Sequence, residues 1–267
     1  MKRLALVWPV LAFCADLVAQ ANPEPGRGLQ NQKSTVADED LPGRLAASHI
    51  RMGKRMSDSQ NGLITITGAI SDDAGTRQAQ LSIQSTGHML YRENAGRALA
   101  FNASGFQKAN GNPNQEDDAL FESLFAHFPD SVFLQASNGG SFRRLGSHFR
   151  ADGSSGGGYV GPYWTIFAFS PKQRADVPAS KALQQDLFIA VDDLTDLVAE
   201  IRVVSESPGG LQRIPQVIQT QFLDWKQYGD QWFPGRIVRL VNGKQAVSFQ
   251  VQQATVSATV AAQTFVP

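Results

Sequence analysis

The chain has 267 residues, and its 24 basic and 24 acidic side chains give a formal net charge of zero. A neutral chain has no field of one sign with which to hold a nucleic-acid backbone, so nucleic acid is excluded as a principal partner. Cys14 is the only cysteine, which excludes a disulfide framework within the chain, so stability must come from a buried core.

The first 21 residues have the pattern of a cleavable secretory signal. Lys2 and Arg3 precede an apolar stretch from Leu4 to Phe13, and Ala19-Gln20-Ala21 offers small residues at the two positions that signal peptidase reads. We therefore expect cleavage after Ala21 and an exported protein, periplasmic or extracellular. The mature chain would then contain no thiol, and past the signal no apolar run is long enough to cross a bilayer.

Two other readings of the N-terminus remain. A membrane anchor is disfavoured because Pro9 and Asp16 interrupt a run that would need about 20 apolar residues to span. Leu11-Ala12-Phe13-Cys14 superficially resembles a lipoprotein signal, in which Cys14 would be lipidated. Phe13 stands where such signals need a very small residue, so cleavage after Ala21 is preferred.

Residues 22–38 are polar and rich in Pro, Gly, Gln and Asn, which predicts a disordered tether. From Leu41 to about Met56, apolar residues recur at spacings of three and four, which predicts an amphipathic helix with Asp40 as its N-cap. We expect a single domain over residues 39–267.

After Gly62 the apolar period changes to two, which predicts strands. Asp72-Asp73-Ala74-Gly75 and Asn94-Ala95-Gly96 separate the first strands as hairpin turns. A helix is predicted over 116–128, with an acidic first turn and with Pro129 ending it. Beyond a Gly- and Ser-rich loop at 152–158, strands are predicted at 163–169, 187–191, 197–204, 217–225, 236–241 and 244–256, the last two joined by Asn242-Gly243.

The strands differ in how many of their faces are apolar. The strand 163–169 is apolar on both faces, whereas 244–256 alternates apolar and polar residues. A sheet of about ten antiparallel strands tends to curl, and helices on its concave side would leave either a filled core or an apolar cavity. The predicted class is therefore α+β, mainly β, with a strongly curved antiparallel sheet.

Two ends of the chain resemble a known family. The segment from Leu41 to Gly68, with Ser48-His49-Ile50-Arg51-Met52-Gly53-Lys54 and then Leu63-Ile64-Thr65-Ile66-Thr67-Gly68, resembles the opening of bacterial LolA-like proteins, the superfamily of outer-membrane lipoprotein carriers. Phe222-Leu223-Asp224-Trp225, Trp232-Phe233-Pro234, Phe249-Gln250-Val251 and Phe265-Val266-Pro267 look like its last strands. Between them, the segment 191–198 is similar to its strand, acidic turn and strand.

The resemblance implies an incomplete antiparallel half barrel whose open mouth is lidded by helices. In the characterised carriers that concavity accepts acyl chains. The chain differs from those carriers in its long Gly/Ser loop and in having no arginine that we can match to the one holding the lid closed.

The sequence offers weak candidates for catalysis. Gly153-Ser154-Ser155-Gly156-Gly157 matches a nucleophile elbow, with His148 upstream, but the glycines lead into Pro162 and a strand instead of a helix, so a serine hydrolase is a remote alternative. The histidines have no metal-binding spacing, and His127 is predicted to cap a helix C-terminus as a cation. We expect no enzyme activity, no cofactor and no metal.

Clusters of charged residues have local explanations. Glu116-Asp117-Asp118 is predicted to lie at a helix N-terminus and Asp192-Asp193 in a hairpin turn, where acids satisfy backbone amides. Arg143 and Arg144, next to Phe142, are predicted to lie on a solvated strand face.

The functional hypothesis is a protein that binds a lipid, a lipoprotein acyl chain or another hydrophobic molecule in the concave face. The alternative is a structural or partner-binding envelope protein whose core is filled by its own side chains. The candidate ligand-contacting residues are Ile64, Ile66, Leu81, Phe121, Phe125, Phe128, Tyr163, Trp164, Phe167, Phe169, Phe222 and Phe249.

Overall fold

The computed structural model describes residues 41–53, 62–85, 87–102, 104–137, 139–150, 163–172, 181–206, 215–258 and 265–267. The signal with its cleavage after Ala21, the tether at 22–38 and the loop at 152–158 lie outside the described residues. Among the helices that are described, none is long and apolar enough to span a bilayer.

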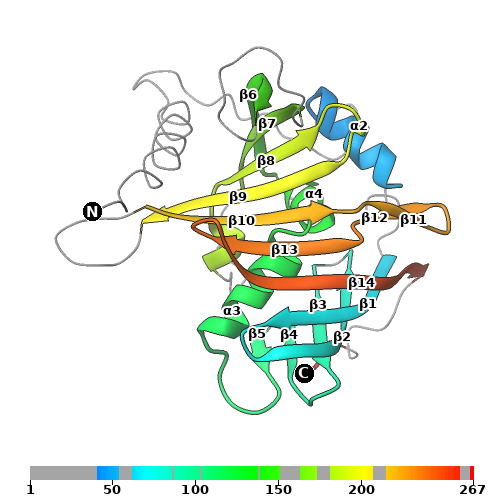
Figure 1. The fold of residues 1–267 in the computed structure, drawn as a ribbon, viewed down its shortest axis with the longest axis vertical. Helices are drawn as coiled ribbons and strands as arrows, with labels where there is room; N and C mark the ends of the chain where they lie inside the picture. Colours follow the sequence, from blue (N-terminus) through cyan, green and yellow to red (C-terminus); the bar gives the residue numbers. More distant parts are fainter. Residues whose placement is uncertain are drawn as a thin grey trace, which may run out of the picture.

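A single antiparallel sheet of 12 strands dominates the fold (Figure 1). Its order is β5-β4-β3-β2-β1-β14-β13-β10-β9-β8-β7-β6, so the first and last strands of the chain pair in the middle of the sheet. In Figure 1 the strands β3 and β4 run across the direction of β9 and β10, which shows how strongly the sheet bends. The strands are β1 Gly62–Asp72, β2 Gly75–Gln84, β3 Met89–Glu93, β4 Ala98–Asn102, β5 Gly105–Lys108, β6 Ser141–Arg150, β7 Tyr163–Ser170, β8 Leu187–Asp192, β9 Val198–Glu206, β10 Pro215–Leu223, β13 Arg236–Val241 and β14 Lys244–Ala258.

The predicted fold class is confirmed. Within the described part of the chain, β5 and β6 lie at opposite edges and do not pair, so the sheet is open. Helices α3 Gln115–Phe121 and α4 Pro129–Ser137 lie over one face, and α2 Gly43–Met52 lies near the β6 end (Figure 1). A small hairpin of β11 Lys226–Tyr228 and β12 Gln231–Phe233 contacts α2, and the short 3-10 helix η2 spans Lys181–Gln184.

Helix α2 is shorter than its apolar spacing predicts. It begins after Pro42, whose extended backbone stands at the N-cap without a side-chain cap, so the prediction of Asp40 as N-cap is wrong. It ends at Met52 because Gly53 adopts φ of 95° and its N–H bonds the carbonyls of His49 and Ile50. Glycine adopts this left-handed conformation without the strain that a Cβ causes, and a residue in this conformation ends a helix. Helix α2 therefore ends before the predicted limit near Met56.

The segment predicted as one helix over 116–128 contains a change of helix type. Helix α3 is followed by a π turn, η1 Glu122–Ala126, and Pro129 begins α4 instead of ending a helix. Proline suits the first turn of a helix, because the amide that it lacks has no partner there. The acidic first turn behaves as predicted: Asn114 and Asp117 form a reciprocal capping box.

One apolar cluster fills the space between the helices and the sheet. Ile64, Ile66 and Ile70 are fully buried on the inner face of β1, as their alternation predicts. Strand β7 is buried less evenly than predicted: Phe167 and Phe169 are at most 1% exposed on the inner face, whereas Trp164 and Ala168 on the outer face are half-buried.

Candidate functional site

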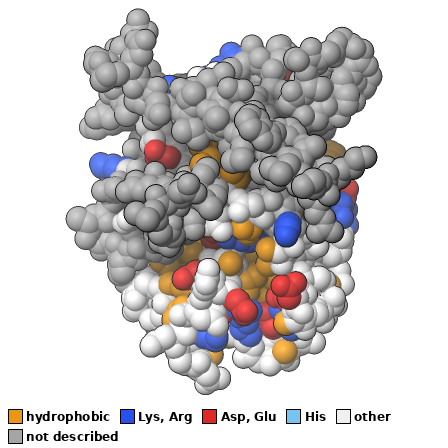
Figure 2. All heavy atoms as spheres, turned by 60° about the vertical axis from the view of Figure 1, so that its left-hand side comes forward, with side chains coloured by type: hydrophobic (Ala, Val, Ile, Leu, Met, Phe, Trp, Pro, Cys, Tyr) orange, Lys and Arg blue, Asp and Glu red, His pale blue; other side chains and the backbone are white. Residues whose placement is uncertain are grey.

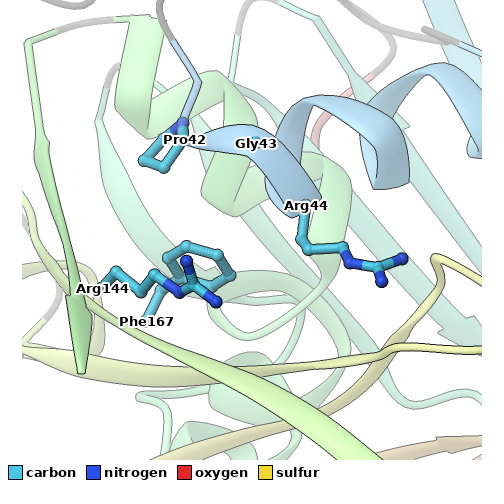
Figure 3. A pocket seen from close by; sticks show the side chains of 5 residues that line it. All are labelled: Pro42, Gly43, Arg44, Arg144 and Phe167. Carbon is cyan, nitrogen blue, oxygen red and sulfur yellow. The ribbon is translucent and has the colours of Figure 1, made fainter. Parts of the chain in front are cut away.

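A partly open pocket of about 300 Å³ lies between the N-terminus of α2 and the strands β6 and β7 (Figure 3). It is lined by Pro42, Gly43, Arg44, Arg144 and Phe167. This volume is at the lower end of the range typical of small-molecule pockets. The pocket therefore has room for part of a ligand, with an aromatic ring on one side and two guanidinium groups near it.

Strand pairing places the ring and one guanidinium side by side. Arg144 on β6 is directly opposite Phe167 on β7, so both side chains lie on the same face of the sheet. The next pair along this face is Phe142 and Phe169, whose ring centroids are 4.8 Å apart. Figure 3 shows the side chain of Arg144 reaching across Phe167.

The other guanidinium is held by the β8–β9 turn. Arg44 Nη1 donates to Asp196 Oδ1, and Arg44 Nε lies 3.6 Å from Asp193 Oδ1. Thr165 Oγ1 in turn donates to Asp193 Oδ1 at 2.6 Å. In Figure 3 the side chain of Arg44 points away from Phe167. These bonds attach the start of α2 to the sheet at the edge of the pocket.

The acidic turn has the local role that the sequence predicts. Asp192 Oδ1 accepts hydrogen bonds from the backbone N–H of Leu194 at 2.9 Å and of Thr195 at 2.8 Å. Asp193 differs, because its Oδ1 lies 3.6 Å from Nε of Arg44, a residue that lines the pocket.

Most of the predicted ligand-contacting residues lie deep in the core, and only Phe167 lines the described pocket. Phe121 and Phe125 pack with centroids 5.3 Å apart, and Phe128 meets Phe222 edge-on at 6.3 Å. Trp164 is half-buried on the face opposite Phe167, and the side chain of Tyr163 lies outside the described residues. Of the predicted ligand-contacting residues, those at most 2% exposed are Ile64, Ile66, Leu81, Phe121, Phe125, Phe128, Phe167, Phe169, Phe222 and Phe249.

Sequence reasoning missed the two arginines of the pocket. Arg144 is exposed, as expected for a solvated strand face, and it shares that face with Phe142 and Phe167. The signal was present in the alternation of β6, which places a cation two residues from Phe142, a partly buried ring that packs against the core. The position of Arg44 could not be found in this way, because its partners are more than 140 residues away.

A buried polar cluster lies beneath the π turn. His127 is 0% exposed, and its Nδ1 lies 3.1 Å from Thr220 Oγ1 on β10. Its Nε2 lies 3.8 Å from Glu122, which also pairs with Arg239 on β13. Burial, aided by the positive charge of Arg239, lowers the pKa of His127 to about 3. His127 is the C-cap residue of η1, as predicted. Its ring is neutral, so the predicted interaction of a cation with the helix C-terminus is wrong.

The other sequence candidates for chemistry are not brought together. Ser155 and the side chain of His148 lie outside the described residues. His49 packs on Phe133, with ring centroids 5.1 Å apart, and His88 packs on Phe265, with ring centroids 5.7 Å apart. Within the described ranges, no group of three or more His, Cys, Asp or Glu side chains is arranged to hold a metal ion.

Charges of both signs are mixed on the face that Figure 2 shows. On the visible described part of the face in Figure 2, acidic and basic side chains lie next to one another with hydrophobic side chains between them. The described part of this face offers no patch of one sign to a polyanion.

No family model matches the chain, and no curated protein matches it. Several solved structures are similar. A Vibrio parahaemolyticus domain assigned to outer membrane lipoprotein sorting is 10% identical, with a TM-score of 0.43, over 83% of this chain and 95% of that one. A LolA superfamily protein from Nitrosomonas europaea is 6% identical, with a TM-score of 0.42, over 82% and 97%.

A DUF1329 family protein from Desulfovibrio piger is 9% identical, with a TM-score of 0.40, over 84% of this chain and 98% of that one. The family that the terminal motifs resemble is thus among the structural matches. The fold itself is defined by the strand order and register of the chain.

Proposed function

We propose that the chain is an exported envelope protein that binds a hydrophobic ligand, a lipid or an acyl chain, at the concave side of its sheet and performs no covalent chemistry. The observation that carries this proposal is the pocket of about 300 Å³ beside Phe167. Phe167 belongs to the apolar core and also lines the pocket, so a ligand in the pocket would contact a core side chain directly. Export is supported by the N-terminal signal pattern.

The size of the pocket limits what it can hold. Ligand pockets of roughly 300–1,000 Å³ bury most of a drug-sized molecule. At the lower end of that range, the pocket accommodates one alkyl chain or part of a larger lipid. Elsewhere in the core, aromatic rings pack against one another: the ring of Phe121 lies 5.2 Å from that of Phe101 and 4.7 Å from that of Phe106, centroid to centroid.

Ligand binding is tested with protein expressed with its own leader and purified from the bacterial envelope. Native mass spectrometry is expected to find a co-purifying lipid, and a neutral fluorescent long-chain alcohol is expected to bind the delipidated protein. Phe167→Leu, which removes the ring, and Phe167→Trp, which enlarges it, should both weaken that binding.

The matched control is Phe249→Leu, the same change at a fully buried ring of β14 that does not line the pocket. If Phe249→Leu weakens binding as much as Phe167→Leu, loss of stability accounts for the effect and the pocket is not the site. Absence of both co-purifying lipid and probe binding would reject the proposal.

A second candidate function is favoured by the packing of the core. Ten of the residues that the sequence suggested for ligand contact are at most 2% exposed and belong to one packed cluster. A half barrel filled in this way would act through its outer surface, as an envelope protein that docks a protein partner. This alternative predicts that Phe167 variants change stability only and that no lipid co-purifies.

A further inference from the structure

The pocket has an asymmetric distribution of charge. Arg44 is compensated by Asp196 and Asp193 of the β8–β9 turn. Arg144 is exposed and has no ion pair with any described residue, although it lies on the same face as the core phenylalanines. Among the described residues, the side of the pocket that Arg144 occupies therefore carries one uncompensated positive charge.

The start of α2, which lines the other side of the pocket, does not neutralise the charge of Arg144. The first turn of α2 contains no acidic residue, and its N-cap provides no side-chain hydrogen bond. Asp193 and Asp196 pair with Arg44, whose side chain points away from Phe167 (Figure 3), and neither is among the residues that line the pocket. An anion beside Phe167 would thus meet the guanidinium of Arg144 without a competing carboxylate among the residues that line the pocket.

We infer that the pocket selects amphiphiles with an anionic head, a carboxylate or a phosphate, which Arg144 binds while the alkyl chain of the ligand lies against Phe167. This inference rests on the proposed function and specifies its ligand class. A guanidinium presents paired N–H donors that match the geometry of carboxylate and phosphate oxygens. The adjacent ring buries hydrocarbon, so one register pair of the sheet contacts both ends of an amphiphile.

Arg144 has another explanation, which the experiment must distinguish. An inward-facing charge on an edge strand also prevents edge-to-edge pairing with another sheet, and β6 is an edge strand among the described residues. That role requires a charge at this position but no ligand.

The test compares three fluorescent probes of equal chain length that end in a carboxylate, a phosphate or a hydroxyl group. The wild-type protein is expected to bind at least one of the two anionic probes about five- to tenfold more tightly than the alcohol at low salt, and less so at high salt. Arg144→Gln should abolish that preference, so that the three probes bind about equally. Arg144→Lys keeps the charge but lacks the paired donors, so it should retain only part of the preference. Comparison of the carboxylate and phosphate probes identifies which head the site prefers.

The control is Arg143→Gln, which removes the same charge from the neighbouring position of β6 on the opposite face. It is expected to leave the preference unchanged. Equal binding of all three probes by the wild type, or an unchanged preference in Arg144→Gln, would overturn the inference while leaving the proposed function intact. Increased self-association of Arg144→Gln with unchanged binding would assign Arg144 to edge protection. Failure of every probe, the alcohol included, would reject the proposed function together with the inference.

Discussion

Glu122 in the π turn and Arg239 on β13 form an ion pair inside the protein, with Arg239 Nη1 2.5 Å from Glu122 Oε2. Their side chains are 10% and 7% exposed, so water contributes little to their solvation. The pair joins the helical layer to the middle of the sheet. Single π turns within α-helices are rare.

Removal of one member of this pair should destabilise the protein strongly. Arg239→Met is expected to lower the free energy of unfolding by about 3–5 kcal/mol, because Glu122 is left as an uncompensated buried charge. The double variant Glu122→Gln with Arg239→Met should recover part of that loss. Chemical denaturation followed by circular dichroism measures both. A double variant no more stable than the single variant would show that packing, and not charge, accounts for the loss.

His127 should remain neutral in the folded protein at every pH at which it is stable. Its folded pKa of about 3 lies below the unfolded value near 6.5, so the unfolded chain binds the extra proton first. Stability therefore falls as the pH decreases from about 6.5 toward 3. NMR titration should show no protonation of the His127 ring between pH 8 and pH 5.

His127→Gln should remove this dependence on pH. The stability difference between wild type and variant is expected to shrink by roughly 2 kcal/mol between pH 7 and pH 5, from a slope of about 1.4 kcal/mol per pH unit. Burial also lowers the pKa of His88, but that contribution is common to both proteins. Parallel pH profiles of the two proteins would contradict the prediction.

Asp117 should contribute stability through its ionised form. Burial raises its pKa, but the hydrogen bond from the Asn114 amide and those from Lys108 and Arg97 outweigh burial, so the pKa is lowered overall. The contribution is present above the unfolded pKa near 3.8 and is lost as the pH falls through the lower folded value. Asp117→Asn is expected to cost about 1–3 kcal/mol at pH 7, measured by denaturation.

The neighbouring Asp118 provides the control for Asp117. The side chain of Asp118 is largely exposed. Partial desolvation and, second, the negative charge of Asp117 raise its pKa. Asp118→Asn should therefore leave stability unchanged or slightly increased at pH 7. An equal loss of stability in both variants would indicate that the effect comes only from the interaction of a negative charge with the N-terminus of α3, and not from the bonds of Asp117 to Lys108 and Arg97.

Gly68 should tolerate no side chain. A Cβ at this position would lie 2.1 Å from the carbonyl oxygen of Gln250, at the irregularity where the β1–β14 register shifts. Gly68→Ala is expected to destabilise the protein by about 1–3 kcal/mol, because backbone must move to relieve the clash. Ala69→Ser, one position along the same strand, serves as the control in thermal denaturation. Equal melting temperatures for Gly68→Ala and the wild type would contradict this reading of the bulge.

Local patterns were sufficient for most of the elements. Alternation predicted β1 and β14, and the Asn242-Gly243 turn between β13 and β14 has both residues at positive φ, as its sequence indicates. Short or unusual elements escaped because their signals are weak. Strand β5 has four residues, and the π turn begins at Glu122, whose partner Arg239 lies on a distant strand that no local pattern reveals.

The sequence by itself determined the antiparallel strands, the residues that face the core and the acidic caps, because these depend on neighbours within a few positions along the chain. Only the tertiary structure decided which of the predicted aromatic residues fill the core and that Phe167 also borders a pocket. It also placed Arg144 beside Phe167 and attached Arg44 to Asp196, 152 positions away. Such contacts depend on strand register and on how the sheet bends, and both are set by packing across the whole molecule.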